Sequence, residues 1–167
     1  MNVSADGMTW QGDRKLIGFG GHYANSEHYR NKVGLVCNWH PPQGGLNART
    51  NLYYMQSADN GQTWTTVEGK PLPLPLDDPA NPALIVEYKS QNRLAYLKDL
   101  TFDEEGNPAI LHIVSRGYES GPDNGPRVWM IAHWTAGEWK QYEVTRSDHN
   151  YDMGSLYIEK DEIGRAS

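Results

Sequence analysis

The stretch RTNLYYMQSADNGQTW, residues 49–64, decides the fold. Its first half is a short run of aromatic and apolar residues, which is typical of a β-strand. Its second half fits the pattern S-x-D-x-G-x-x-W, in which Asp59 can accept backbone N–H bonds from its own turn. Gly61 supplies a positive φ and Trp64 packs into the seam behind the turn. The stretch therefore predicts a strand that closes in a tight turn.

The same arrangement recurs along the chain. RVWMIAHWTAGEW (127–139) also opens with Arg, runs through a strand, turns through Gly and closes on Trp, with a turn three residues shorter. Upstream, VGLVCNWHPP (33–42) parallels AILHIVSRGY (109–118), and IGFGGHYANS (17–26) parallels AYLKDLTFDE (95–104). A third copy begins at HNYDMGSLYIEKDEIG (149–164). The repeat predicts a four-stranded antiparallel blade.

Two further turns resemble the one at 57–64. Ser4–Trp10 carries the same residues with one missing, and Thr135–Trp139 is a more degraded version. No stretch shows a convincing amphipathic helix. We expect strands at 16–19, 33–39, 51–56, 63–67, 94–102, 109–114, 128–134, 139–144 and 154–159.

Composition agrees with an all-β chain. The 167 residues suffice for one domain, and 6 Trp and 10 Tyr accompany 17 Gly and 10 Pro. Lys and Arg number 15 against 21 Asp and Glu, giving a net charge of −6, which argues against nucleic acid or an anionic membrane as a partner. No apolar run is long enough to span a bilayer, and MNVSADGMTW shows no signal-peptide pattern. The single Cys37 excludes an intrachain disulfide, and we expect no metal or cofactor.

The S-x-D-x-G-x-x-W pattern, together with GGHYANS and CNWHPP, resembles the Asp-box (BNR-repeat) β-propellers of the sialidase superfamily. The closest likeness is to BNR-repeat proteins assigned to polysaccharide processing, and more distantly to the ulvan lyases. The resemblance implies a structural role for Ser57, Asp59, Gly61 and Trp64, on the face opposite the active site. It also implies an extracytoplasmic or secreted location, and an acidic carbohydrate and the remaining blades of a parent protein as partners.

These features together predict an all-β fragment of a β-propeller with four-stranded antiparallel blades, about two whole and two partial. The parent would have about six or seven blades, because closed propellers have four to eight. We expect residues 1–167 to form a single partial propeller. Its expected parts are the end of one blade (1–15), a blade with the Asp box (16–70), another blade (94–146) and the start of a further blade (149–167).

In a propeller, the loops between the second and third strands and between blades gather on one face around the axis. Repeat logic pairs His40 with Arg116 and Arg49 with Arg127 on neighbouring blades. Arg binds carboxylates or sulfates in bidentate fashion, while His and Tyr transfer protons. The candidate catalytic residues are His40, Arg116, His149 and Tyr151. The candidate substrate-binding residues are His22, Tyr23, Trp39, Arg49, Arg127, Asp148 and Asp152.

The leading expectation for such a face is recognition and cleavage of glycosidic bonds in an acidic oligo- or polysaccharide, and hydrolase and lyase chemistry both remain open. Sialidase chemistry needs a Tyr–Glu pair and an Arg cluster, and no such pair is identifiable. β-Elimination on a uronate needs a cation, a base and an acid, which Arg, His and Tyr provide. A non-catalytic glycan- or protein-binding propeller and a pure scaffold are the alternatives. We expect His112, His133 and Cys37 to pack in the interior.

Overall fold

The computed structural model describes residues 1–2, 4–159 and 162–166. The described residues contain β-strands and two short 3-10 helices and no α-helix. The strands are β1 (Ala24–Tyr29), β2 (Lys32–Trp39), β3 (Thr50–Ser57), β4 (Leu84–Val86), β5 (Leu94–Phe102), β6 (Pro108–Ser115), β7 (Arg127–Thr135), β8 (Glu138–Ser147), β9 (Leu156–Glu159) and β10 (Glu162–Ala166). The 3-10 helices are η1 (Gly45–Ala48) and η2 (Pro122–Asn124).

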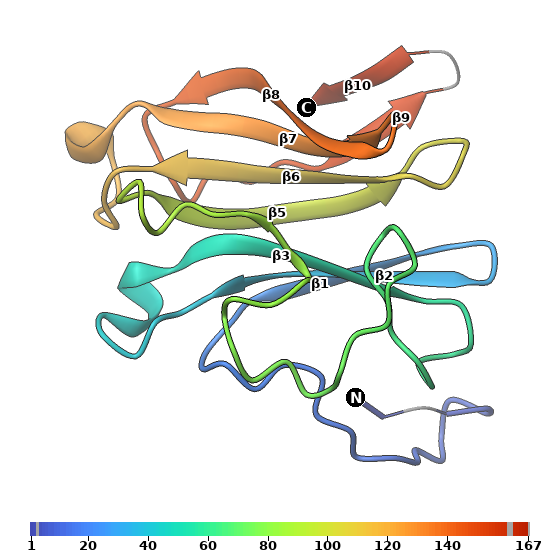
Figure 1. The fold of residues 1–167 in the computed structure, drawn as a ribbon. Helices are drawn as coiled ribbons and strands as arrows, with labels where there is room; N and C mark the ends of the chain where they lie inside the picture. Colours follow the sequence, from blue (N-terminus) through green and yellow to red (C-terminus); the bar gives the residue numbers. More distant parts are fainter. Residues whose placement is uncertain (3, 160–161, 167) are drawn as a thin grey trace.

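The strands form two four-stranded sheets and one two-stranded sheet (Figure 1). The sheet orders are β1-β2-β3-β4 and β5-β6-β7-β8, with β9 paired to β10, and every pairing is antiparallel. Each sheet is thus a meander in which sequence neighbours pair. The strands that come first in each sheet, β1, β5 and β9, also lie next to one another, since β5 contacts both β1 and β9. The chain is an all-β, incomplete propeller of four-stranded antiparallel blades, as the repeat predicted.

The blades stack face to face, and their middle strands are buried on both sides. In β3, Leu52 and Tyr54 point toward the second blade, while Tyr53 and Met55 point away from it into another cluster. Likewise β6 places Ile110 between the two blades. Leu111 and Ile113 point toward β9 on the other side, where Leu156 packs against them. A strand buried on both faces reads as a continuous apolar run, which is why β3 and β6 were recognisable in the sequence.

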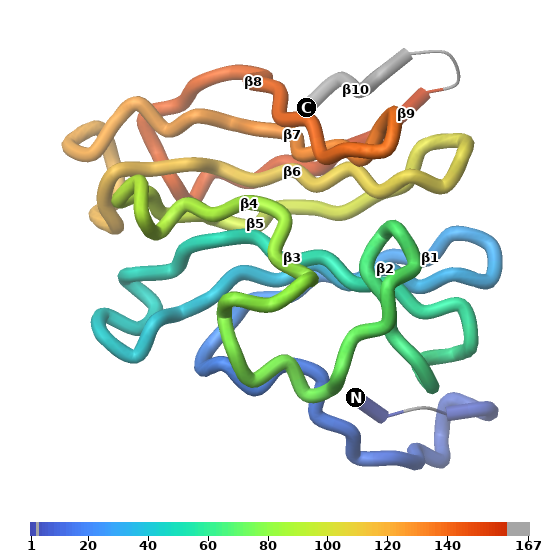
Figure 2. The backbone as a smooth tube through the Cα atoms, viewed as in Figure 1, coloured from blue at the N-terminus to red at the C-terminus, as the bar shows by residue number. Residues whose placement is uncertain are grey.

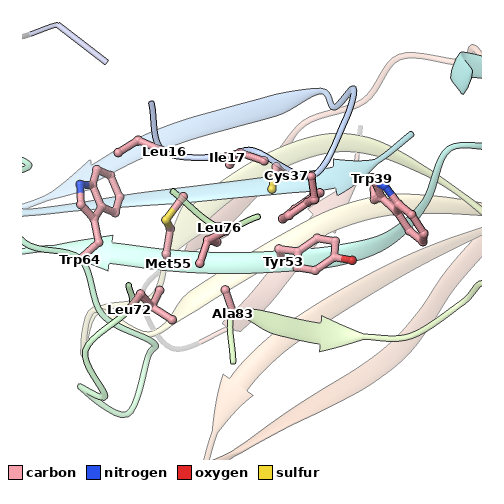
Figure 3. Close-up of a cluster of buried hydrophobic side chains, with 11 residues drawn as sticks. Leu16, Ile17, Cys37, Trp39, Tyr53, Met55, Trp64, Leu72, Leu76 and Ala83 are labelled. Carbon is pink, nitrogen blue, oxygen red and sulfur yellow. The ribbon is translucent and has the colours of Figure 1, made fainter. Parts of the chain in front are cut away.

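The outer face of the first blade is covered by segments that belong to no sheet. Figure 3 shows this core cluster, in which Trp64 and Trp39 lie at opposite ends. Leu16 and Ile17 enter it from the N-terminal segment, and Leu72 and Leu76 enter it from the loop before β4. These loop residues take the place of a neighbouring blade on that face.

The first blade differs from expectation at its first strand. The predicted strand 16–19 makes one isolated bridge, Ile17 to Leu76, and the sheet begins at Ala24 instead. The polar stretch around His28 was not among the expected strands, but it forms β1. Most of β1 is exposed to solvent as an innermost edge strand, so its sequence carries no apolar alternation.

The fourth strand of the first blade also lies elsewhere. The predicted strand 63–67 provides only isolated bridges at Thr65, and β4 lies at Leu84–Val86, beyond the expected boundary at residue 70. Between them the chain makes a long excursion with five prolines, visible as the green loop in Figure 2. Proline cannot donate to a ladder, so this segment contributes apolar side chains without extending the sheet.

The turn at 57–64 is fastened by its own side chains. Ser57 Oγ donates to Asp59 Oδ1 (2.7 Å) and accepts from Gly61 N (2.8 Å). Asp59 in turn accepts from Thr63 N (2.9 Å) and Thr63 Oγ1 (2.6 Å). These bonds lower the pKa of the Asp59 carboxyl to about 2. Gly61 has φ 82°, a conformation that side chains disfavour.

The shorter turn at Ser4–Trp10 has the same bonds among its Ser, Asp, Gly and Thr residues. Asp6 Oδ1 accepts from Thr9 N (2.7 Å) and Met8 N (2.9 Å), while Ser4 Oγ accepts from Gly7 N (2.8 Å). The missing residue therefore leaves these shared bonds in place, and the bond from Met8 N to Asp6 is an addition to them.

The third turn, at 135–139, is different in kind. It is a two-residue hairpin in which Ala136 and Gly137 have φ 53° and 80°, the signs of a type I′ turn. Here β7 and β8 pair directly, and Trp134 and Trp139 face each other across the hairpin at 5.8 Å. The expectation of a degraded Asp-box turn at 135–139 was wrong, because a two-residue loop leaves no room for the side-chain network.

Trp64 and Trp10 occupy the same motif position in different surroundings, which gives a matched test. Trp64 is 3% exposed and Trp10 is 62% exposed. We expect Trp64→Ala to lower the free energy of unfolding by about 3–5 kcal/mol, because a large buried side chain is lost. Trp10→Ala should change it by less than about 0.5 kcal/mol. Denaturant unfolding of the two variants measures this, and equal losses would contradict the assignment.

His112 should make stability depend on pH. It is fully buried in β6, with Nε2 2.9 Å from the Tyr88 hydroxyl, and burial lowers its pKa from 6.5 to about 4. Between pH 6.5 and 4 the imidazole is therefore protonated in the unfolded chain but neutral in the folded chain. The free energy of unfolding thus falls as pH drops from 6.5 toward 4. We expect His112→Leu to flatten this fall, measured by denaturant unfolding at pH 7 and pH 4.5. His28→Gln, at an exposed position, should retain the wild-type slope.

Candidate functional site

One end of the blades carries most of the candidate residues. The 3-10 helices η1 and η2 lie at this end, at the left of Figure 1, and the β1–β2 and β5–β6 hairpins lie at the other. His40 and Arg116 directly follow β2 and β6, and Arg49 and Arg127 stand where β3 and β7 begin. The repeat positions thus share this end. The fastened turn after β3 lies at the opposite end.

Arg49 is the centre of an aromatic cluster. Its guanidinium carbon lies 4.6 Å from the ring centroid of Tyr96, 5.3 Å from Tyr23 and 6.0 Å from Tyr151. Its Nε donates to the carbonyl of Leu46 in η1 (2.8 Å), which fixes the guanidinium plane. Arg49 is only 5% exposed. The three tyrosines come from three different segments, so the tertiary structure alone brings them together.

His40 lies on the Tyr23 side of the cluster. The two rings meet edge to face at 5.1 Å, and His40 N donates to Gly21 O (2.7 Å). A Cβ at Gly21 would lie 3.1 Å from His40 Nδ1, so glycine leaves the room that the imidazole needs. Its Nε2 is buried and has no partner among the described residues. Burial, with help from the charge of Arg49 and from His22, lowers the pKa of His40, so the imidazole is neutral at neutral pH.

Tyr96 lies in β5 and was missed by sequence reasoning. It is buried, and its hydroxyl has no hydrogen-bond partner among the described residues. Burial raises the pKa of this phenol, although Asn150 and the charges of Arg49 and Arg127 partly oppose the rise. In the sequence Tyr96 looked like an ordinary core position of an apolar strand. The available signal was its place two residues before Lys98 on an innermost strand.

The segment between β8 and β9 closes the cluster. Tyr151 meets Tyr96 edge to face at 6.0 Å, and its own ring lies 5.9 Å from that of His149. Tyr151 N donates to His149 Nδ1 (3.2 Å), which leaves Nε2 to carry the proton of a neutral ring. Asn150 is fully buried and donates to the carbonyl of Tyr118 (3.1 Å).

Two more cations lie near these residues. Arg127 is fully buried; its Nη2 donates to the carbonyl of Glu119 (2.6 Å), while Nε and Nη1 have no partner among the described residues. Lys98 Nζ donates to the carbonyl of Asn150 (3.3 Å), and burial lowers its pKa, against the opposing charge of Asp152. None of the ion pairs found in the described part of the chain includes Arg49, Arg127 or Lys98. Arg49 and Arg127 therefore carry positive charge with no ion-pair partner among the described residues, while Asp152 lies close enough to Lys98 to affect its pKa.

The structure places the remaining candidates outside this cluster. Arg116 is exposed and lines a separate groove. Trp39 is buried, with Lys89 Nζ lying 4.4 Å above its ring, so its face is covered. His22 and Asp148 are exposed, and His22 is close enough to influence His40. Trp39, a candidate substrate-binding residue in the sequence, therefore has no free ring face on the side that Lys89 covers.

A metal-ligand cluster and a membrane-spanning helix each have structural requirements, and neither set is met in the part of the chain that the structure describes. Within residues 1–2, 4–159 and 162–166, no three His, Cys, Asp or Glu side chains are grouped so as to hold a metal ion. No helix among these residues is long and apolar enough to cross a membrane.

Fold and site together define a β-propeller with a cationic, tyrosine-lined face. Residues 8–147 match the sequence profile of the BNR repeat-containing family, and the chain belongs to this family. No curated protein sequence matches the chain.

Solved structures with the same fold include an ulvan lyase described as a new family of polysaccharide lyase. It aligns with a TM-score of 0.74 at 16% identity, over 93% of this chain and 40% of the lyase. A second structure is such an ulvan lyase bound to -[GlcA(1-4)Rha3S]-, with a TM-score of 0.66 at 17% identity, over 84% of this chain and 36% of the lyase. The chain thus spans about two fifths of the length of these lyases.

The electrostatic link between Arg49 and His40 gives a direct test of the cluster. Removing the guanidinium in Arg49→Gln should raise the pKa of His40, because a nearby positive charge no longer opposes protonation. Titration of the imidazole by NMR measures this. The matched control is Arg146→Gln, which removes a surface charge paired with Glu143. An unchanged pKa in Arg49→Gln would show that the two side chains are not coupled.

Proposed function

We propose that this protein binds an acidic polysaccharide on the face that carries Arg49 and its three tyrosines, here called the Arg49 face. We propose that it cleaves this polysaccharide by β-elimination at a uronate. The observation that carries the proposal is the buried positive charge of Arg49 and Arg127, which no carboxylate among the described residues balances. A buried charge without a partner is costly, so such groups are retained where a ligand supplies the opposite charge. A carboxylate or sulfate matches the fork of a guanidinium.

The protonation states of the neighbouring side chains suit elimination. Arg49 would neutralise the uronate carboxylate, which makes the C5 proton more acidic. Neutral His40 would accept that proton through its free Nε2. As the C4–O bond breaks and the C4–C5 double bond forms, a protonated tyrosine, Tyr96 or Tyr151, would give its proton to the leaving oxygen. The pKa of His40 is lowered, which keeps this base unprotonated, and the pKa of Tyr96 is raised, which keeps this acid protonated.

The similarity to ulvan lyases supports the same substrate class, since one of those structures is bound to -[GlcA(1-4)Rha3S]-. Hydrolysis of the sialidase type receives less support, because the hydroxyl of Tyr96, the buried tyrosine of the cluster, has no hydrogen-bond partner among the described residues and thus no paired glutamate there. We extend the proposal to an extracytoplasmic location, where such polymers occur. We also propose that further blades of the parent pack beside this chain, because Trp10 exposes a large apolar surface.

A non-catalytic glycan-binding propeller is the second candidate. A binder needs only a cationic and aromatic surface, and Tyr23 and Tyr151 are each 49% exposed beside Arg49. This candidate requires no proton transfer.

The test is an assay of the full chain on uronate-containing polysaccharides, sulfated and unsulfated. The readouts are ultraviolet absorbance of the unsaturated uronate product and, in parallel, new reducing ends. We expect absorbance to rise, and we expect His40→Gln and Arg49→Gln to lower the rate by about 100-fold or more. His28→Gln, an exposed histidine on β1, is the matched control and should keep the wild-type rate.

Two results would redirect the assignment. Reducing ends without absorbance would mean hydrolysis. Binding that Arg49→Gln abolishes, with no product of either kind, would make the protein a glycan-binding propeller.

A further inference from the structure

A second cationic surface lies beside the Arg49 cluster, and it accounts for Arg116. Two adjoining hollows, of about 320 and 480 Å³, share Arg93 and Arg116 in their walls. We call them together the Arg93–Arg116 groove. The smaller hollow contains Ala48 and Thr50, the chain neighbours of Arg49. The groove therefore starts at the edge of the proposed site and runs over the end of the second blade.

The walls of the groove carry only positive charge. Lys89, Arg93, Arg116 and Arg146 line it, and no Asp or Glu does. Arg146 is already paired with Glu143 (2.6 Å). Neither Arg93 nor Arg116 belongs to any ion pair found in the described residues. Since the whole chain has a net charge of −6, this local positive surface is an exception to the surface as a whole.

The floor of the groove is apolar. In the larger hollow it is made by Val114, Pro126, Val128 and Met130, which lie at the ends of β6 and β7. An apolar floor with a cationic rim fits a polymer of sugar rings, whose C–H faces pack on apolar surface while their anionic substituents reach the rim. A flexible polyanion without ring faces would make no use of the floor.

The wall between the two blades is held in place by buried polar contacts. Asn51 Oδ1 accepts from Tyr88 N (2.8 Å) and Lys89 N (3.0 Å). Thr50 Oγ1 donates to the carbonyl of Arg93 (2.8 Å). These bonds use the backbone of Arg93 and leave its guanidinium free to meet a ligand. They also tie the groove to the residues that follow Arg49.

We propose that the Arg93–Arg116 groove is an outer subsite for the same acidic polysaccharide, binding anionic groups on sugars beyond those at Arg49. The inference deepens the proposed function and rests on it for the identity of the polymer. It makes Arg116 a residue that binds the polysaccharide away from Arg49, and Arg116 is then no longer a candidate catalytic residue. Short fragments would occupy the Arg49 face alone, and long ones would occupy both surfaces.

The experiment compares affinities for a long sulfated, glucuronate-containing polysaccharide and for its tetrasaccharide, by calorimetry with the full chain. The test variant is Arg93→Gln combined with Arg116→Gln. The backbone of Arg93 bonds to Tyr88 and Thr50, and neither guanidinium belongs to an ion pair among the described residues. The control variant is Arg30→Gln combined with Lys70→Gln, which removes two exposed charges away from the groove. Thermal unfolding checks that each variant is folded.

We expect the test variant to bind the long polymer roughly tenfold more weakly, with a smaller dependence on salt, and to bind the tetrasaccharide as the wild type does. The control variant should bind both as the wild type does. Arg49→Gln, and Arg49→Lys in case the first does not fold, should weaken binding of both ligands. That pattern supports both proposals.

Other patterns separate the two proposals. If the test variant keeps wild-type affinity for the long polymer while Arg49→Gln loses it, the groove is no subsite but the proposed function stands. If only the test variant loses binding, the groove binds polysaccharide and the Arg49 face does not. Binding of polyglutamate of matched length with equal affinity would overturn the groove's preference for sugars. Absence of binding to any acidic polysaccharide would overturn both.

Discussion

Burial of the middle strands on both faces is the constraint on which the rest of the structure depends. β3 and β6 have no solvent side, so a single blade leaves one apolar face uncovered until another layer packs on it. The second blade covers one face of the first, and the loops around Leu16 and Leu72 cover the other. Because the layers stack in order, the ends of equivalent strands fall at the same end of the molecule. The site is assembled from those ends.

The sequence was most informative where a strand is wholly buried or a turn makes its own bonds. The apolar runs of β3 and β6 and the spacing of Ser57, Asp59 and Gly61 each determine local structure without help from distant residues. It was least informative for β1 and β4. The first is polar because it faces solvent, and the second follows a long proline-rich excursion whose length no local signal fixes.

The repeat also predicted part of the site, and the reason is geometric. Equivalent positions such as Arg49 and Arg127 must share one end of the blades, and both are buried cations there. The partners of a cation cannot be deduced in this way. Tyr96 looks like an interior residue in its own strand, and only the packing of the two blades and the β8–β9 segment reveals that its ring lies against the guanidinium of Arg49. The same limit explains Arg116, whose repeat position placed it at the correct end but not in the correct hollow.

The two Asp turns, at Ser4–Trp10 and Ser57–Trp64, share the bonds among their Ser, Asp, Gly and Thr residues although one tryptophan is exposed and the other is buried. The bonds of the turn are therefore independent of the docking of the tryptophan. Such a segment adopts the same conformation wherever its sequence is repeated, because its own side chains make the bonds that hold it. Tandem duplication of blades can then lengthen a chain without redesigning each turn. Only the tryptophan depends on its surroundings, since Trp64 packs in the core cluster beside Leu16 and Leu72 while Trp10 is exposed.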